Sequence, residues 1–166
     1  MVHSTRRRFL GGVGVTFGVG VAGCVGDDTG DDDVETPPAD VPPRIHDFLQ
    51  HARGYDRAIE DRRGEGTIDV SVGAGDQGLS FDPVAIRIDI GTTVEWEWTG
   101  DGGIHDVVSI GGSDFQFGSD RTREAGHTFD HTFDDGGVAL YECRPHRTQR
   151  MLGAIDVMFE EDDVEH

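Results

Sequence analysis

The sequence predicts an all-β domain, a Greek-key β-sandwich preceded by a short helix. From Thr67 onward apolar and polar residues alternate, as they do in 84–90 and 94–98. Glycine-bearing turns such as Gly100-Asp101-Gly102-Gly103 separate the alternating runs. About seven or eight short strands with frequent turn signals are typical of an antiparallel sandwich, because a strand with one buried face alternates with a period of two.

The first 23 residues have the pattern of an export signal. Arg6-Arg7-Arg8-Phe9-Leu10 resembles the twin-arginine motif, which serves proteins that are exported already folded. The apolar run 10–22 has 13 residues, fewer than the roughly 20 that cross a bilayer as a helix. It ends in Val21-Ala22-Gly23-Cys24, which resembles a lipobox whose cysteine is lipidated. We therefore expect residues 1–23 to be a lipoprotein signal peptide and Cys24 to be the lipid anchor.

The segments on either side of the domain have a different composition. Residues 24–43 are rich in aspartate and proline, so they contain too little apolar side chain to offset the entropy of ordering, and a disordered acidic stalk is expected. Ile45, Phe48, Leu49 and Ala52 then recur with helical spacing, which predicts a short helix on the domain. Residues 44–159 form the expected domain, and 160–166 form an acidic tail.

The charge of the chain is strongly negative. The formal net charge is −19, every basic residue is an arginine, and loss of the three leader arginines would take the mature chain to −22. Such a surface repels nucleic acid and anionic lipid headgroups, so neither is an expected partner. A lysine-free, aspartate-rich surface also indicates adaptation to molar salt, where the Debye length falls to roughly 3 Å.

The chemistry is concentrated in 141–153, which contains Cys143, His146 and Met151 in a Cys-x2-His-x4-Met pattern with Pro145 between the first two. A thiolate and an imidazole two residues apart can converge across one tight loop. A second imidazole is required, and His105 follows the glycine-rich turn at the mouth of another predicted strand. One cysteine, two histidines and a weak axial methionine make up a blue copper site.

Other metals fit this pattern less well. Zinc could take two histidines, a cysteine and a water, but methionine is not a preferred zinc ligand. Haem c attachment and Rieske clusters both require two nearby cysteines. His127 and His131 alternate in phase with Phe129 and Phe133 in a predicted strand, so we expect structural or surface roles for these two histidines. The remaining histidines lack any partner spacing.

Residues from about 47 to 159 resemble the halocyanin family, relatives of plastocyanin within the cupredoxin fold. The resemblance rests on the Cys143–Met151 loop and on the segments 92–103 and 125–129. It implies that His105, Cys143, His146 and Met151 hold one copper ion. Two positions depart from the family pattern: Asp106 stands where an asparagine normally pins the ligand loop, and Arg150 stands where a glycine precedes the methionine.

Four protein ligands leave no open position for a substrate, so the sequence indicates an electron carrier and not an enzyme. By the family resemblance His146 is the electron port, and the docking patch consists of Pro145, Arg147, Arg150 and Leu152. The expected partners are redox proteins of the membrane electron-transport chain. We expect the protein to be a monomer that is lipid-anchored at the extracytoplasmic face of the membrane. Two alternatives remain open: a copper-delivery protein without electron traffic, and a subunit of a respiratory or denitrifying enzyme.

Overall fold

The computed structural model describes residues 36–159. The expected signal peptide, Cys24, the greater part of the stalk and the tail from residue 160 lie outside the described residues. No helix in the described part of the chain is both long and apolar enough to span a membrane.

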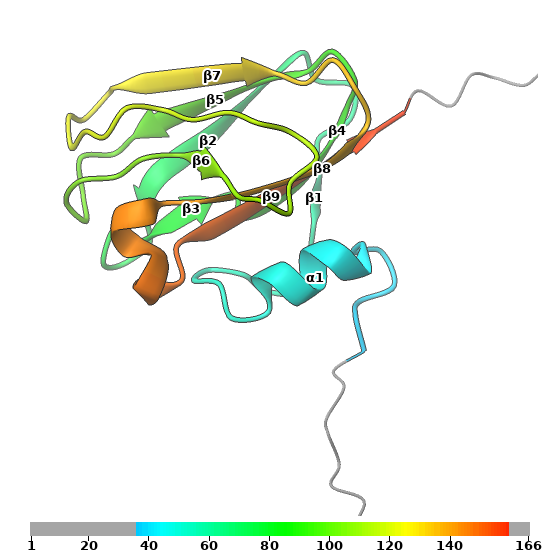
Figure 1. Cartoon of the computed structure of the whole chain (residues 1–166), viewed down its shortest axis with the longest axis horizontal. Coiled ribbons are helices and arrows are strands. Elements are labelled where there is room, and N and C mark those ends of the chain that lie inside the picture. The colour runs from blue at the N-terminus through cyan, green and yellow to red at the C-terminus, as the bar shows by residue number, and fades with distance from the viewer. Residues whose placement is uncertain (1–35, 160–166) are drawn as a thin grey trace, which may run out of the picture. The chain divides into compact units, whose positions relative to one another are not determined.

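Two β-sheets face each other and enclose the main core (Figure 1). One sheet has five strands in the order β1 (Glu60–Asp61), β4 (Ala85–Asp89), β9 (Leu152–Met158), β8 (Gly137–Glu142), β6 (Val108–Ser109). The other has four strands in the order β3 (Ser80–Asp82), β2 (Thr67–Ala74), β5 (Thr93–Trp98), β7 (Thr128–Thr132). The predicted all-β sandwich is therefore confirmed.

The expectation of a purely antiparallel sandwich was wrong, because both sheets are mixed. Strands β2 and β5 pair in parallel, with Val70 opposite Trp96, and β4 pairs in parallel with β9, with Ile86 opposite Ile155. Parallel neighbours require a crossover connection, here through the opposite sheet. Apolar alternation reports which face of a strand is buried but contains no information about the direction of its neighbour.

The core between the sheets is built around Trp96, which is fully buried on β5. Its ring stacks between Phe117 and Phe129 at centroid distances of 5.4 and 5.6 Å and meets Tyr141 edge-on at 5.4 Å. Aromatic contacts of this kind contribute about 0.5–1.5 kcal/mol beyond the burial of area. This cluster connects both sheets and therefore fixes the strands that flank the functional site.

The predicted helix is confirmed as α1 (Pro43–Leu49), and it covers the outer face of the five-stranded sheet. Ile45 and Leu49 are fully buried against a second apolar cluster that includes Leu140, Leu152 and Ala154. Strand β9 is consequently buried on both faces, which explains why its apolar positions do not simply alternate with exposed ones.

Candidate metal centre

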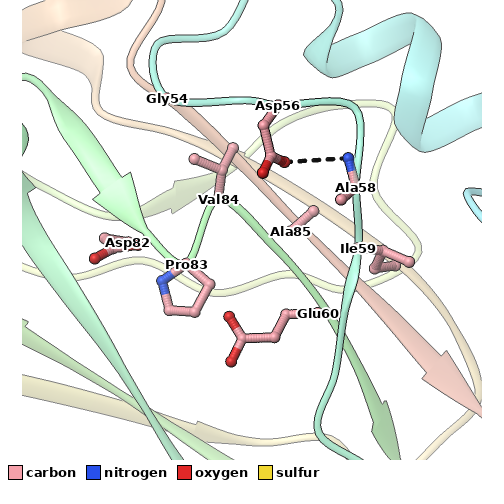
Figure 2. A pocket seen from close by; sticks show the side chains of 9 residues that line it. All are labelled: Gly54, Asp56, Ala58, Ile59, Glu60, Asp82, Pro83, Val84 and Ala85. Atoms are coloured by element: carbon pink, nitrogen blue, oxygen red, sulfur yellow. Dashed lines mark hydrogen bonds between the residues drawn. The ribbon is translucent and has the colours of Figure 1, made fainter.

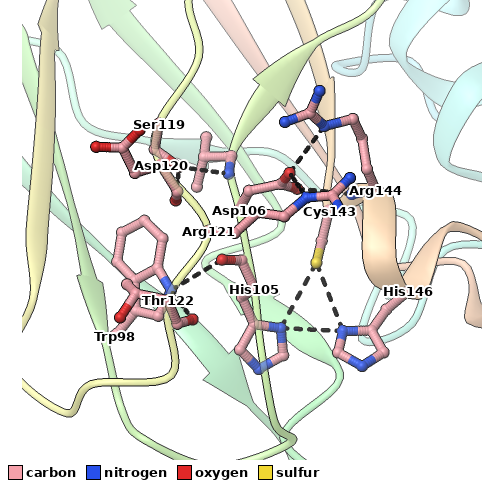
Figure 3. A network of polar contacts seen from close by, with 11 residues as sticks. Trp98, His105, Asp106, Ser119, Asp120, Arg121, Thr122, Cys143, Arg144 and His146 are labelled. Atoms are coloured by element: carbon pink, nitrogen blue, oxygen red, sulfur yellow. Dashed lines mark hydrogen bonds and ion pairs between the residues drawn. The ribbon is translucent and has the colours of Figure 1, made fainter.

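Three side-chain donor atoms converge at one end of the sandwich (Figure 3). His105 Nδ1 and His146 Nδ1 lie 3.1 Å apart, and Cys143 Sγ lies 3.6 and 3.5 Å from these two atoms respectively. The cluster is shielded from water, since His105 and Cys143 are fully buried and His146 is half-buried. Two imidazole nitrogens and a thiol brought together at a largely buried position form a soft metal-binding site.

The loop between β8 and β9 brings Cys143, His146 and Met151 together. Cys143 directly follows β8, and the irregular 3-10 helix η1 (Arg144–Gln149) then turns the chain, with His146 N–H donating to the Cys143 carbonyl at 3.1 Å. The chain then returns, so that Cys143 N–H donates to the Met151 carbonyl at 3.0 Å. Met151 is fully buried in the same apolar cluster as Cys143. A tight turn between two paired strands thus positions three of the four predicted ligands.

His105 comes from a different part of the chain, and its ring is fixed from behind. Its backbone N–H donates to the Thr122 carbonyl at 2.9 Å and its carbonyl accepts from Thr122 N–H at 3.0 Å. Its Nε2 lies 2.7 Å from the Asp101 carbonyl oxygen, which can only accept, so Nε2 carries the proton and donates. The lone pair of Nδ1 is therefore directed at Cys143 and His146, as a metal ligand requires.

Glycine is required behind this ring. Gly73 and Gly102 have φ of 90° and 77°, and a Cβ on either would lie within 3.1 Å of His105 Nε2. Gly102 would also collide with the backbone of Gly78. Glycines therefore let the backbone at residues 73 and 102 approach the His105 ring closely, while Gly78 packs against the turn 100–103 from the other side.

Burial shifts the ionisation of the cluster towards neutral forms. Burial raises the pKa of the Cys143 thiol above its ordinary 9.0, and burial together with the neighbouring His105 lowers the pKa of His146. The charged forms lose hydration in the apolar cavity, which explains both directions. Near neutral pH the metal-free cluster therefore contains a protonated thiol and an unprotonated His146.

The spacing of the donor atoms fits a single metal ion. From the three distances, a point equidistant from Sγ and the two Nδ1 atoms lies about 2 Å from each, close to ordinary metal–nitrogen and metal–sulfur bond lengths. A thiolate, two imidazoles and an adjacent buried thioether form the donor set that copper prefers. The donor set therefore fits one copper ion, which His105, Cys143, His146 and Met151 would hold.

Asp106 connects the two segments that hold this cluster. Its carboxylate is fully buried and accepts from Arg144 N–H at 2.7 Å, from Arg144 Nε at 2.8 Å and from Arg121 Nε at 3.1 Å. Pro145, the other residue expected to support the ligands, lies half-buried in the first turn of η1.

The four residues expected to form a docking patch have different surroundings. Arg147 and Arg150 are exposed beside His146, and Arg147 forms an ion pair of 3.3 Å with Glu142. Arg150 has φ of 62°, a left-handed conformation that explains why the family pattern has glycine there. Leu152 is only 7% exposed and packs against the cluster beneath α1. The prediction that its side chain belongs to the docking patch is therefore wrong.

Sequence reasoning missed several residues of the site. The Asp101 carbonyl that orients His105 is a backbone group and leaves no side-chain signal. Arg121 lies 15 residues from Asp106 along the chain, in a segment without a motif. Ile104, beside His105, is 49% exposed and is one of two large apolar side chains exposed in the described part of the chain. An exposed apolar side chain next to a ligand is available for contact with another protein.

Within residues 36–159, no second group of histidine, cysteine and carboxylate side chains comes together in the way this cluster does. A hollow between segment 54–60 and the start of β4 is lined by Asp56, Glu60 and Asp82 (Figure 2). The carboxylate of Asp56 already accepts from the backbone N–H of Ala58 at 3.2 Å. Its lining contains neither histidine nor cysteine, so the hollow provides no soft metal ligand. His46, which has no partner spacing in the sequence, is buried with its Nδ1 3.0 Å from the Tyr55 hydroxyl.

Comparison with known proteins agrees with this geometry. A sequence profile of the copper-binding proteins of the plastocyanin/azurin family matches residues 68–158. The chain is 49% identical to the halocyanin of Natronomonas pharaonis over 166 residues, which cover 95% of this chain and 99% of that protein.

Solved structures with similar folds are more distant. Pseudoazurin from Methylobacterium extorquens is 26% identical with a TM-score of 0.46, covering 58% of this chain and 78% of that one. A copper-containing nitrite reductase from Thermus scotoductus is 27% identical with a TM-score of 0.47, covering 55% of this chain but only 22% of the enzyme, so the chain spans about a fifth of its length. On the evidence of the family profile and the halocyanin relative, the chain belongs to the plastocyanin/azurin family of copper-binding proteins and is a halocyanin homologue.

Proposed function

We propose that this protein is a blue copper electron carrier that exchanges single electrons between redox partners outside the cytoplasm. The observation that carries the proposal is the buried Cys143 thiol facing two imidazole Nδ1 atoms at 3.5 and 3.6 Å. Copper bound there would supply one-electron chemistry through the Cu(II)/Cu(I) couple. The protein residues hold the donor atoms in place, exclude water, and keep His105 in the tautomer that ligates.

A carrier fits this arrangement better than an enzyme. His105, Cys143, His146 and Met151 would supply every ligand, so no position is left for a substrate on the metal. The similarity to a nitrite reductase covers only about a fifth of that enzyme, so the catalytic activity of the enzyme is not assigned to this chain. A copper-delivery role is the second candidate, since the same ligands would also bind cargo copper.

The spectrum of the copper-loaded protein tests the proposed site. Stoichiometric Cu(II) should produce an intense visible band from charge transfer between the Cys143 thiolate and copper, and reduction should abolish it. Cys143→Ser should lose the band while keeping the circular dichroism of the sandwich. A Cys143→Ser protein that stays intensely coloured would show that the thiolate has been assigned to the wrong residue.

We place the partner-docking face at the end of the sandwich around His146. His146 is the half-exposed ligand, and Pro145, Arg147, Arg150 and Ile104 lie in the loops that hold the ligands. At high salt, long-range steering is screened, so short-range contacts of Ile104 and the arginines would dominate docking.

Ile104→Asp should slow electron exchange with membranes or a purified partner while leaving the visible spectrum unchanged. Phe159→Asp is the matched control, because Phe159 is 69% exposed and follows the far end of β9. Equal slowing by both variants, or by neither, would contradict this placement of the docking face.

We also propose that the protein is a lipid-anchored monomer at the extracytoplasmic face of the membrane. The support is the sequence of residues 1–24, with its arginine pair, short apolar run and lipobox-like end at Cys24. Cys24→Ala should move the processed protein from the membrane fraction to the medium. A processed variant that remains in the membrane would require another anchor.

A further inference from the structure

Two arginines surround Asp106, next to the cluster that holds the donor atoms (Figure 3). The side chain of Asp106 is 0% exposed, whereas those of Arg121 and Arg144 are 55% and 47% exposed. An isolated buried carboxylate would be strongly destabilising, so the two guanidinium groups are required partners and not incidental surface pairs. We define this trio as the Asp106 clamp.

The clamp connects three chain segments at the positions of the ligands. Asp106 directly follows His105, Arg144 directly follows Cys143, and Arg121 precedes Thr122, whose backbone pairs with His105. The shortest contact, 2.7 Å from Arg144 N–H to Asp106 Oδ1, fixes the backbone immediately after the cysteine. Movement of any one segment would therefore change the separation of Nδ1 and Sγ.

We propose that Asp106 is a positioning residue whose negative charge, paired with Arg121 and Arg144, holds the ligand segments together and tunes the reduction potential. This proposal rests on the proposed electron-carrier function. Asparagine would not reproduce all of these contacts. The carboxylate accepts from three donors, whereas an amide has one acceptor oxygen and would direct its own NH2 group at the arginines.

The charges of the clamp have opposite effects on the potential. A nearby negative charge favours the more positive Cu(II) state, so neutralising Asp106 should raise the potential. A nearby positive charge favours Cu(I), so neutralising Arg144 should lower it. A residue with only a structural role would give no reason for opposite signs.

The test measures the reduction potential of Asp106→Asn, Arg144→Gln and the double variant in the copper-loaded protein. We expect an upward shift, a downward shift and an intermediate value, respectively. Asp156→Asn is the matched control, because Asp156 is 8% exposed and pairs with Arg87 at 2.8 Å on β4 and β9. Single variants that shift in the same direction, or a control that shifts as far as they do, would overturn the tuning role.

A second measurement on the copper-free protein tests the positioning role independently. Amide hydrogen exchange at Arg144 should be at least about tenfold faster in Asp106→Ala, because the buried acceptor of its N–H is lost. If Asp106→Ala does not fold, Arg121→Gln and Arg144→Gln, which change exposed side chains, should loosen the same amide to a smaller degree. Unchanged exchange would overturn the clamp. An uncoloured wild-type protein would instead refute the proposed function and leave this readout intact.

Discussion

At the scale of single residues, the burial of Cys143 opposes the charged form that binds metal. Burial raises the pKa of this thiol, and burial together with His105 lowers the pKa of His146. Above pH 6.5 the neutral His146 therefore binds metal without losing a proton, whereas the thiol must release one. Copper binding and proton release are coupled at this one residue.

We expect copper binding between pH 7 and 9 to release one proton, so the apparent affinity should rise about tenfold per pH unit. The sign follows from the raised pKa of Cys143, since the thiol stays protonated in the metal-free protein throughout this interval. Calorimetric or competition titrations at several pH values measure the slope. An affinity that does not change with pH would mean that Cys143 is already a thiolate or does not bind copper.

Met151 differs from the other ligands in the strength of its expected bond. Met151→Leu preserves apolar volume but removes a weak thioether donor that favours Cu(II), so the variant should keep copper and have a higher reduction potential. Voltammetry with copper quantified by atomic absorption measures both properties. The same potential in variant and wild type would exclude Met151 as the axial ligand.

At the scale of elements, α1 stabilises the sheet from which the ligand loop emerges. Leu49 is fully buried against a cluster that includes Leu152, the first residue of β9 after the loop. The helix therefore contributes to stability on the outer face of the sheet, while the donor atoms lie at the end of the sandwich. Stability and metal chemistry should be separable by mutation.

Leu49→Ala should lower the free energy of unfolding by about 2–5 kcal/mol, the range for removing a buried leucine side chain. The visible spectrum of the copper-loaded variant should stay unchanged. Chemical denaturation of the copper-free protein gives the stability, and Gln50→Ala next to the helix is an exposed control. A changed spectrum in Leu49→Ala would show that α1 also acts on the ligand loop.

The sequence predicted the elements better than their pairing. Alternation identified β2, β4 and β5, and helical spacing identified α1, because burial of one face imposes a period on the order of apolar residues. The parallel pairing of β2 with β5 left no such trace. The Cys143–Met151 loop could be recognised because its ligands lie close together in sequence. The contacts of Asp106 with Arg121 and of His105 with the Asp101 carbonyl depend on how distant segments pack, and no motif marks them.

At the scale of the whole molecule, the charge is the dominant feature. The formal charge of −19, which becomes −22 if residues 1–23 are removed, leaves many carboxylates without a basic partner. Basic side chains are concentrated near the ligand loop. Arg121 and Arg144 pair with Asp106, and Arg147 and Arg150 lie in η1 and at its end. Repulsion between carboxylates should therefore act on the domain as a whole, whereas arginines offset the negative charge near the metal centre.

Dilution from molar to millimolar monovalent salt should lower the melting temperature, because the Debye length grows and carboxylate repulsion is no longer screened. The comparison requires saturating copper, since metal loss would also destabilise the protein. Scanning calorimetry over the salt series measures the effect. A melting temperature independent of salt would contradict adaptation to molar salt.

Repeated redox cycling tests the central claim most directly. The copper-loaded protein is reduced and reoxidised many times, by an electrode or by membranes of the source organism, while the visible band and the bound copper are measured. A carrier with four protein ligands should recover its full absorbance in each cycle and retain one copper ion per chain. Progressive loss of copper, with its transfer to an acceptor protein, would contradict electron carriage and favour copper delivery.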